Sequence, residues 1–167
     1  MTNNSLAFTA LCNEYCAALE NCGADTPRSF VQNMLRLLPR IYITASDIPA
    51  DSFGDGFVGP ALDEDSYEAV RRNVAALMGN DDTYLEVFEE DMKYSDTPIG
   101  ASVSENLADL FQVFYNFLET VREAPEPIVE QALAGVKEEF CNYWGQTLCN
   151  VMRPLNNIFY NSTDLDD

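Results

Sequence analysis

The sequence contains no histidine. Histidine is the commonest metal ligand and the usual acid–base group near neutral pH. Its absence excludes Ser-His-Asp and Cys-His catalytic sites, histidine-containing zinc sites and di-iron sites of the Glu-x-x-His type. The two glycine-rich phosphate-binding motifs, GxxxxGK[ST] and GxGxxG, are also absent. We therefore predict no catalytic residues, no metal ligands and no cofactor, and we favour a protein that is not an enzyme.

Basic residues are scarce. Nine Lys and Arg stand against 28 Asp and Glu, so the net charge is −19 at pH 7 and the pI is ≈ 4.1. Nucleic acids and anionic membranes carry charge of the same sign, which disfavours direct binding to either. No apolar run reaches the ~18 residues of a membrane span, and the N-terminus lacks the basic and apolar segments of a secretory signal. We expect a cytoplasmic protein that is not held in a membrane.

The five cysteines form no Cys-x-x-Cys pair, and their number is odd. This pattern indicates reduced thiols rather than a disulfide framework. Cys12 and Cys16 are one helical turn apart, and Cys141 and Cys149 are two turns apart. A metal or redox site is the alternative interpretation. Because these spacings follow the surrounding apolar stripes, we expect small buried side chains in the core.

Apolar residues recur at helical spacing along nearly the whole chain. Thr26-Pro27 and the capping box Ser102-x-x-Glu105 mark two helix starts, and Pro154 should bend the last helix. We predict an all-α, single-domain bundle of five or six helices over residues 1–160, followed by an acidic tail over 161–167. The predicted helices cover residues 6–22, 26–45, 63–78, 102–121 and 125–160.

Two segments interrupt this pattern. Residues 46–62 are rich in glycine and proline, which predicts a long loop. Residues 81–98 fit either helical turns or a short extended piece. They contain Glu86-x-x-Glu89-Glu90-Asp91, which is similar to half of the magnesium-binding pattern of all-α nucleotide pyrophosphatases. The second half of that pattern is missing, so a magnesium-dependent hydrolase is only an alternative.

One face of the predicted helix 102–121 is polar. Four residues lie on it at steps of four, three and four: Glu105, Asp109, Gln112 and Asn116. Together with Trp144 and Arg153 on the last helix, they could line a pocket for a cationic or hydrogen-bonding ligand. The alternatives are a solvated polar face, or a buried ion pair between Asp109 and Arg153 that sets the helix register.

Several motifs resemble a bacterial, all-helical family of unknown function. They are Leu38-Pro39-x-x-Tyr42 with Ile48-Pro49, Glu105-x-x-x-Asp109-x-x-Gln112, Phe140-x-x-x-Trp144-Gly145, and Arg153. The resemblance covers about residues 6–158 and implies an all-α bundle without an established activity. Family members usually carry histidines where this chain has Tyr143 and Asn156. Any site built on those imidazoles would be altered here.

The function hypotheses belong to two classes. The first is a cytosolic, non-enzymatic domain that binds a protein partner or a second copy of itself. It is favoured by the missing catalytic groups, by the acidic composition and by aromatic residues on more than one side of helix 102–121. The second is a small-molecule or metal-binding pocket near Asp109 and Arg153. The first predicts an exposed apolar or grooved surface, and the second a cavity with converging polar groups.

Overall fold

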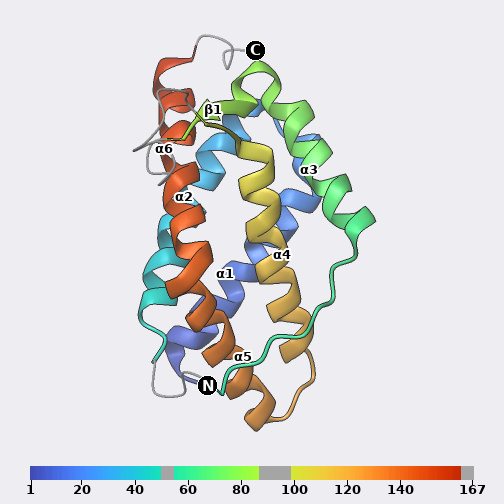
Figure 1. Cartoon of the computed structure of the whole chain (residues 1–167), viewed down its shortest axis with the longest axis vertical. Helices are drawn as coiled ribbons and strands as arrows, with labels where there is room; N and C mark the ends of the chain where they lie inside the picture. The colour runs from blue at the N-terminus through green and yellow to red at the C-terminus, as the bar shows by residue number, and fades with distance from the viewer. Residues whose placement is uncertain (50–54, 87–98, 163–167) are drawn as a thin grey trace.

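The computed structural model describes residues 1–49, 55–86 and 99–162 (Figure 1). Within them, α1 packs against α2 and α4, and α6 packs against the same two helices, so four helices form a closed ring. α3 lies outside this ring against α4. The α-helices are α1 (Asn3–Glu20), α2 (Pro27–Ser46), α3 (Glu64–Met78), α4 (Val103–Val121), α5 (Glu126–Glu139) and α6 (Gly145–Asn161). The all-α prediction with a long C-terminal helix is confirmed.

Local capping explains where the helices begin. Thr26 and Ser29 form a reciprocal capping box at the start of α2, with Pro27 at the first helical position. Asp63 accepts a hydrogen bond from the Ser66 backbone N–H at 2.7 Å at the start of α3. Both starts match the prediction. Short 3₁₀ turns follow α1 at Cys22–Ala24 and α3 at Gly79–Asp82.

The ring encloses an aromatic core. The Phe8 ring lies 5.4 Å from that of Phe117, and the Phe114 ring lies 5.2 Å from that of Trp144. Tyr15 is also fully buried, and its hydroxyl donates to the Leu107 carbonyl at 2.7 Å. Since aromatic side chains bury large areas, these rings from α1, α4 and the C-terminal helix hold the bundle together.

The C-terminal helix contains a π-turn, Phe140–Trp144, between α5 and α6. Wide turns of this kind bring the carbonyl of residue i close to residue i+5. A Cβ atom on Gly145 would lie only 2.6 Å from the Phe140 carbonyl oxygen. The atoms nearest to this Cβ all belong to Phe140, so the π-turn itself favours glycine at position 145.

The structure decides one of the two alternatives left open for the start of segment 81–98. Thr83–Leu85 is extended and forms β1, which pairs antiparallel with β2 (Gly100–Ser102), a strand that was not predicted. The pattern Glu86-x-x-Glu89-Glu90-Asp91 lies outside the described residues except for Glu86. The acidic tail likewise lies outside them after position 162.

The cysteines divide into two groups. Cys12, Cys16 and Cys22 are buried in the core, as predicted. Cys141 and Cys149 are exposed, so for them the prediction is wrong. Successive helical residues lie about 100° apart, and Leu148 occupies the buried side of α6, which turns Cys149 outward.

Candidate functional site

The six residues predicted to share a site lie in different surroundings. Trp144 is fully buried, and its indole N–H donates to the Val136 carbonyl at 2.9 Å. Arg153 is exposed on the outer face of α6, beside Tyr84 and Leu85. Asp109 faces α3 instead, and among the described residues no ion pair joins it to Arg153. The structure therefore does not form the buried pair considered from the sequence.

Asp109 fixes α3 against α4. Its carboxylate accepts a hydrogen bond from the Tyr67 hydroxyl at 2.5 Å. Burial raises the pKa of Asp109, although the Tyr67 hydrogen bond opposes this by favouring the charged form. Burial and the adjacent carboxylate also raise the pKa of Tyr67. The Tyr67 hydroxyl therefore stays protonated and donates a hydrogen bond to the Asp109 carboxylate.

Asn116 fixes the segment that precedes α3. Its Oδ1 accepts hydrogen bonds from the backbone N–H groups of Ala61 and Leu62, at 3.0 and 2.8 Å. One turn further along α4, the Thr120 hydroxyl accepts from the Gly59 backbone N–H at 3.0 Å. We call residues 55–62 the strap, because they run in extended form across α5 and α4 to the start of α3 (Figure 1). Asn116 therefore has a structural partner.

The strap crosses α5 where two glycines meet. A Cβ atom on Gly56 would lie 2.4 Å from the backbone nitrogen of Gly135, and one on Gly135 would lie 2.9 Å from the Phe57 nitrogen. Either Cβ would force the backbones apart. The contact is closed by a hydrogen bond from the Phe57 N–H to the Gln131 carbonyl at 2.9 Å.

A pocket of ≈ 430 Å³ lies between the strap, α4 and the end of α5; we call it the strap pocket. Its volume falls within the usual range for small-ligand sites. Of the predicted site residues, the strap pocket contains Gln112. Burial, together with the carboxylates of Asp109 and Glu139, raises the pKa of Tyr143. The polar and aromatic lining includes Phe57, Gln112, Asn116, Glu138, Glu139 and Tyr143.

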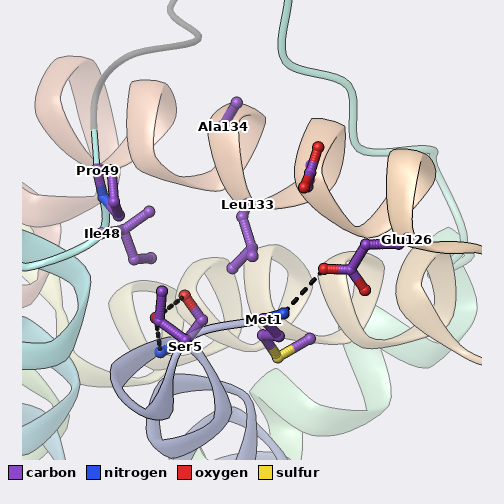
Figure 2. Close-up of a pocket in the computed structure, with 9 residues that line it drawn as sticks. Met1, Ser5, Ile48, Pro49, Glu126, Leu133 and Ala134 are labelled. Carbon is purple, nitrogen blue, oxygen red and sulfur yellow. Dashed lines mark hydrogen bonds and ion pairs between the residues drawn. The ribbon is translucent and has the colours of Figure 1, made fainter.

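A second pocket, of ≈ 520 Å³, lies at the N-terminal end of α1 (Figure 2). The Met1 ammonium donates to the Glu126 carboxylate at 2.9 Å, and this pairing raises the pKa of the amine. Ser5, Ile48 and Leu133 complete its wall. The Met1 ammonium and Glu126 therefore pair with each other, and the carboxylate of Glu130 also lines the pocket.

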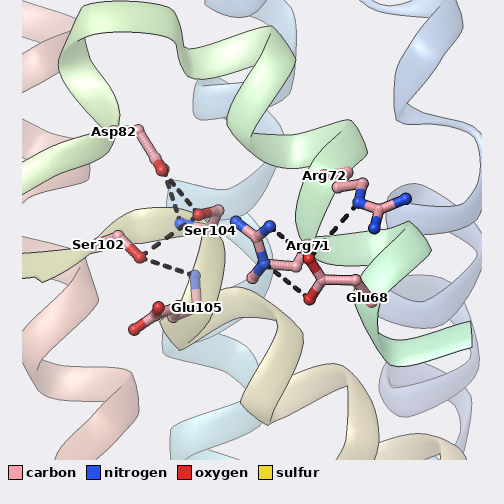
Figure 3. A network of polar contacts seen from close by, with 7 residues as sticks. All are labelled: Glu68, Arg71, Arg72, Asp82, Ser102, Ser104 and Glu105. Carbon is pink, nitrogen blue, oxygen red and sulfur yellow. Dashed lines mark hydrogen bonds and ion pairs between the residues drawn. The ribbon is translucent and has the colours of Figure 1, made fainter. Parts of the chain in front are cut away.

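The start of α4 carries a polar network that includes Glu105 (Figure 3). Ser102 accepts from the Glu105 backbone N–H at 3.1 Å, which forms one half of the predicted capping box. The Asp82 carboxylate accepts from the backbone and hydroxyl of Ser104 at 2.8 and 2.7 Å. Glu105 therefore acts through its backbone at a helix start. No group of three or more His, Cys, Asp or Glu within the described ranges could hold a metal ion.

The outer surfaces of α2 and α6 differ in charge from the rest of the molecule. These neighbouring helices contain no Asp or Glu, whereas α3, α4 and α5 contain ten. We call this surface the α2–α6 face; its exposed residues include Arg28, Arg36, Arg40, Ile43, Arg153 and Tyr160. In the described part of the chain, Arg36, Arg40 and Arg153 have no carboxylate partner. The Arg28 guanidinium lies 4.5 Å from the Phe159 ring centre.

Two shallow pockets extend along the α2–α6 face. One, of ≈ 420 Å³, lies between Tyr42 and Phe140; the other, of ≈ 370 Å³, lies between α6 and β1. They share Cys149 and Asn150. Leu85 at the edge of the second pocket is 62% exposed. The second pocket contains Arg153 and the exposed Leu85 together with the buried carboxylate of Glu86.

The fold and these surfaces define a small all-helical domain with an extended segment packed across α5 and α4. The chain belongs to the family described as a domain of unknown function, DUF5063, whose model matches residues 1–161. It is similar to the crystal structure of protein BF1032 from Bacteroides fragilis, with 28% identity and a TM-score of 0.81 over 96% of this chain and 94% of that chain. Among curated proteins, none matches the sequence. In the described residues, no helix combines the length and apolarity that crossing a membrane requires.

Sequence reasoning overlooked several residues of these surfaces. Glu138 and Glu139 were not predicted as site residues, because no local sequence pattern indicates that their helix packs against the strap. The arginines of the α2–α6 face could have been found, since the absence of acidic residues from two long helices is visible in the sequence. That the two helices are neighbours comes only from the tertiary structure.

Proposed function

We propose that the protein is a non-enzymatic interaction domain, and that its α2–α6 face binds an acidic segment of a partner protein. One observation carries the proposal: two adjacent helices hold four of the nine basic residues and no carboxylate, in a chain of net charge −19. Arginines with exposed apolar neighbours are typical of protein interfaces. The same two helices carry exposed apolar side chains, Ile43 on α2 and Tyr160 on α6, at 59% and 70% exposed.

Charge also indicates the kind of partner. At physiological salt, fields are screened over about 8 Å, so a docked segment responds to the local arginines more than to the distant carboxylates. A symmetric dimer through the α2–α6 face would bring two sets of arginines together, and their repulsion disfavours it. An acidic segment that also carries aromatic or aliphatic residues would match both the charge and the exposed apolar groups.

Peptide selection tests the proposal. A display library of random peptides is selected on the immobilised protein at physiological salt and again at high salt. We expect enrichment of Asp and Glu together with aromatic or aliphatic residues, and weaker binding at high salt. The variant Arg36→Glu/Arg40→Glu should lose the enriched peptides. The matched control, Arg72→Glu/Arg122→Glu, reverses two exposed charges on α3 and after α4 and should retain them.

Three outcomes would overturn the proposal. They are enrichment without acidic residues, failure to enrich any peptide, and equal binding by the face variant and its control. Sedimentation of the full chain addresses self-association. A dimer that is lost in Arg36→Glu/Arg40→Glu would make a second copy the occupant of the face, in place of an acidic partner.

A further inference from the structure

The strap pocket is independent of the α2–α6 face and has the opposite electrostatic character. Its lining contains two carboxylates, Glu138 and Glu139, and no Lys or Arg. Asp109 lies close enough to the pocket for its carboxylate to raise the pKa of Tyr143. Three acidic side chains from α4 and α5 therefore produce a negative potential around one cavity.

Aromatic and amide groups complete the lining. Phe57 from the strap is 59% exposed, and Tyr143 from the π-turn is 51% exposed. Exposed rings beside carboxylates can bind a cation through their faces, because the ring quadrupole attracts positive charge. The Gln112 side chain supplies a neutral hydrogen-bonding group, while Val58 and Val113 supply apolar contacts.

We propose that the strap pocket binds a small organic cation, with an ammonium or guanidinium head on a short apolar stem. The carboxylates would neutralise the head, the rings of Phe57 and Tyr143 would contact it, and the valines would cover the stem. The two carboxylates of the lining would repel an anionic ligand. They also provide too few ligands for a hard metal ion, which is usually coordinated by six or more oxygen atoms.

The strap gives the pocket its wall. The segment is held by the hydrogen bonds to Asn116 and Thr120 and by the Gly56–Gly135 contact, so the cavity exists before a ligand arrives. A preformed site loses little conformational entropy on binding. The pocket can therefore bind small cations without folding of a further segment.

The test is a titration of the ¹⁵N-labelled full chain, followed by NMR. The probes are n-butylammonium, n-butylguanidinium and choline, with 3,3-dimethylbutan-1-ol as the neutral isostere of choline and sodium chloride as the ionic-strength control. We expect at least one cation to shift the amide signals of residues 56–58, 112–113 and 138–143. For such small probes a Kd of about 1 mM is expected.

Matched variants separate a site from general attraction to an acidic protein. Glu138→Gln/Glu139→Gln should weaken binding about tenfold, the loss expected when charged hydrogen-bond partners are removed. Glu119→Gln/Glu130→Gln removes the same charge from α4 and α5 outside the pocket and should change the Kd less than about twofold. Tyr143→Leu should weaken choline binding in particular.

Each contrary result decides against the proposal. Shifts scattered over the acidic surface would show non-specific attraction. Equal binding of the neutral isostere would show that the charge is not recognised, and equal Kd values for the pocket and control variants would exclude the two carboxylates. The absence of any shift at 20-fold the expected Kd, about 20 mM probe, would rule out the site.

Discussion

Lys137 provides a sharp test of how the bundle is held together. Its side chain is buried with 7% exposed, and its ammonium donates to the carbonyls of Ala45 and Ser46 at 3.1 and 2.6 Å. These carbonyls are at the end of α2, where the helix dipole concentrates negative charge. The ammonium also lies 5.6 Å from the Phe140 ring centre. Lys137 therefore caps α2 from α5 through two backbone carbonyls.

The substitution Lys137→Met keeps the length of the stem and removes the charge. Hydrogen bonds from charged groups are each worth about 1.5–3 kcal/mol, and part of this gain is offset because the buried ammonium loses its hydration. The Ala45 carbonyl keeps a second donor, the Ile48 N–H at 3.2 Å, so the loss falls mainly on Ser46. We expect a net destabilisation of about 2–3 kcal/mol, which lowers the Tm by roughly 4–12 °C for a chain of this size.

Urea unfolding measures this change. Circular dichroism at 222 nm follows the helices, and the fluorescence of Trp144, the single tryptophan, follows the core. Glu130→Gln removes a charge from the exposed side of the same helix and should be nearly neutral. If Lys137→Met unfolds at the same urea concentration as the natural chain, or at a higher one, the cost of burying the ammonium exceeds the capping energy and our reasoning fails.

Three further predictions concern the core and the polar face. Gly145→Ala places a Cβ 2.6 Å from the Phe140 carbonyl oxygen, so thermal unfolding should show a loss of about 1–3 kcal/mol; an unchanged Tm would mean that the π-turn relaxes freely. Burial raises the pKa of Asp109, so the folded state binds the carboxyl proton of Asp109 more tightly than the unfolded chain does. The unfolding free energy of the natural chain therefore falls as the pH rises above about 3.9, the pKa of Asp in the unfolded chain. Urea unfolding at pH 4 and pH 7 should show that Asp109→Asn lacks this part of the pH dependence. If the unfolding free energies of the variant and the natural chain change equally between the two pH values, the prediction is wrong. Burial also raises the pKa of Cys16 to about 12, so mass spectrometry should find this thiol labelled by Ellman's reagent only in urea, and rapid native labelling would refute its burial.

The interaction hypothesis and the pocket hypothesis now concern different surfaces. The sequence placed the alternative pocket between Asp109 and Arg153. In the structure, the cavity near Asp109 is the strap pocket, while Arg153 belongs to the α2–α6 face. The two proposals can therefore be tested separately, because the variants that test them change different residues.

Local signals in the sequence determined the helices. The caps at Thr26 and Asp63 act within one helical turn, and the apolar period needs only one segment at a time, so both could be read directly. The charge of −19 and the missing histidine were likewise complete in the sequence. The π-turn was not predicted, since its extra residue breaks no strong pattern in the flanking stripes.

Only the tertiary structure decided the partners of the polar side chains. Asp109 meets Tyr67, which is 42 positions away, and Gly56 meets Gly135 across a crossing that no local spacing encodes. Helical periodicity tells which face of a segment is polar, but it does not tell which other segment packs there. The strap pocket and the α2–α6 face therefore arise from packing, because each combines residues whose neighbours are set by the arrangement of whole helices.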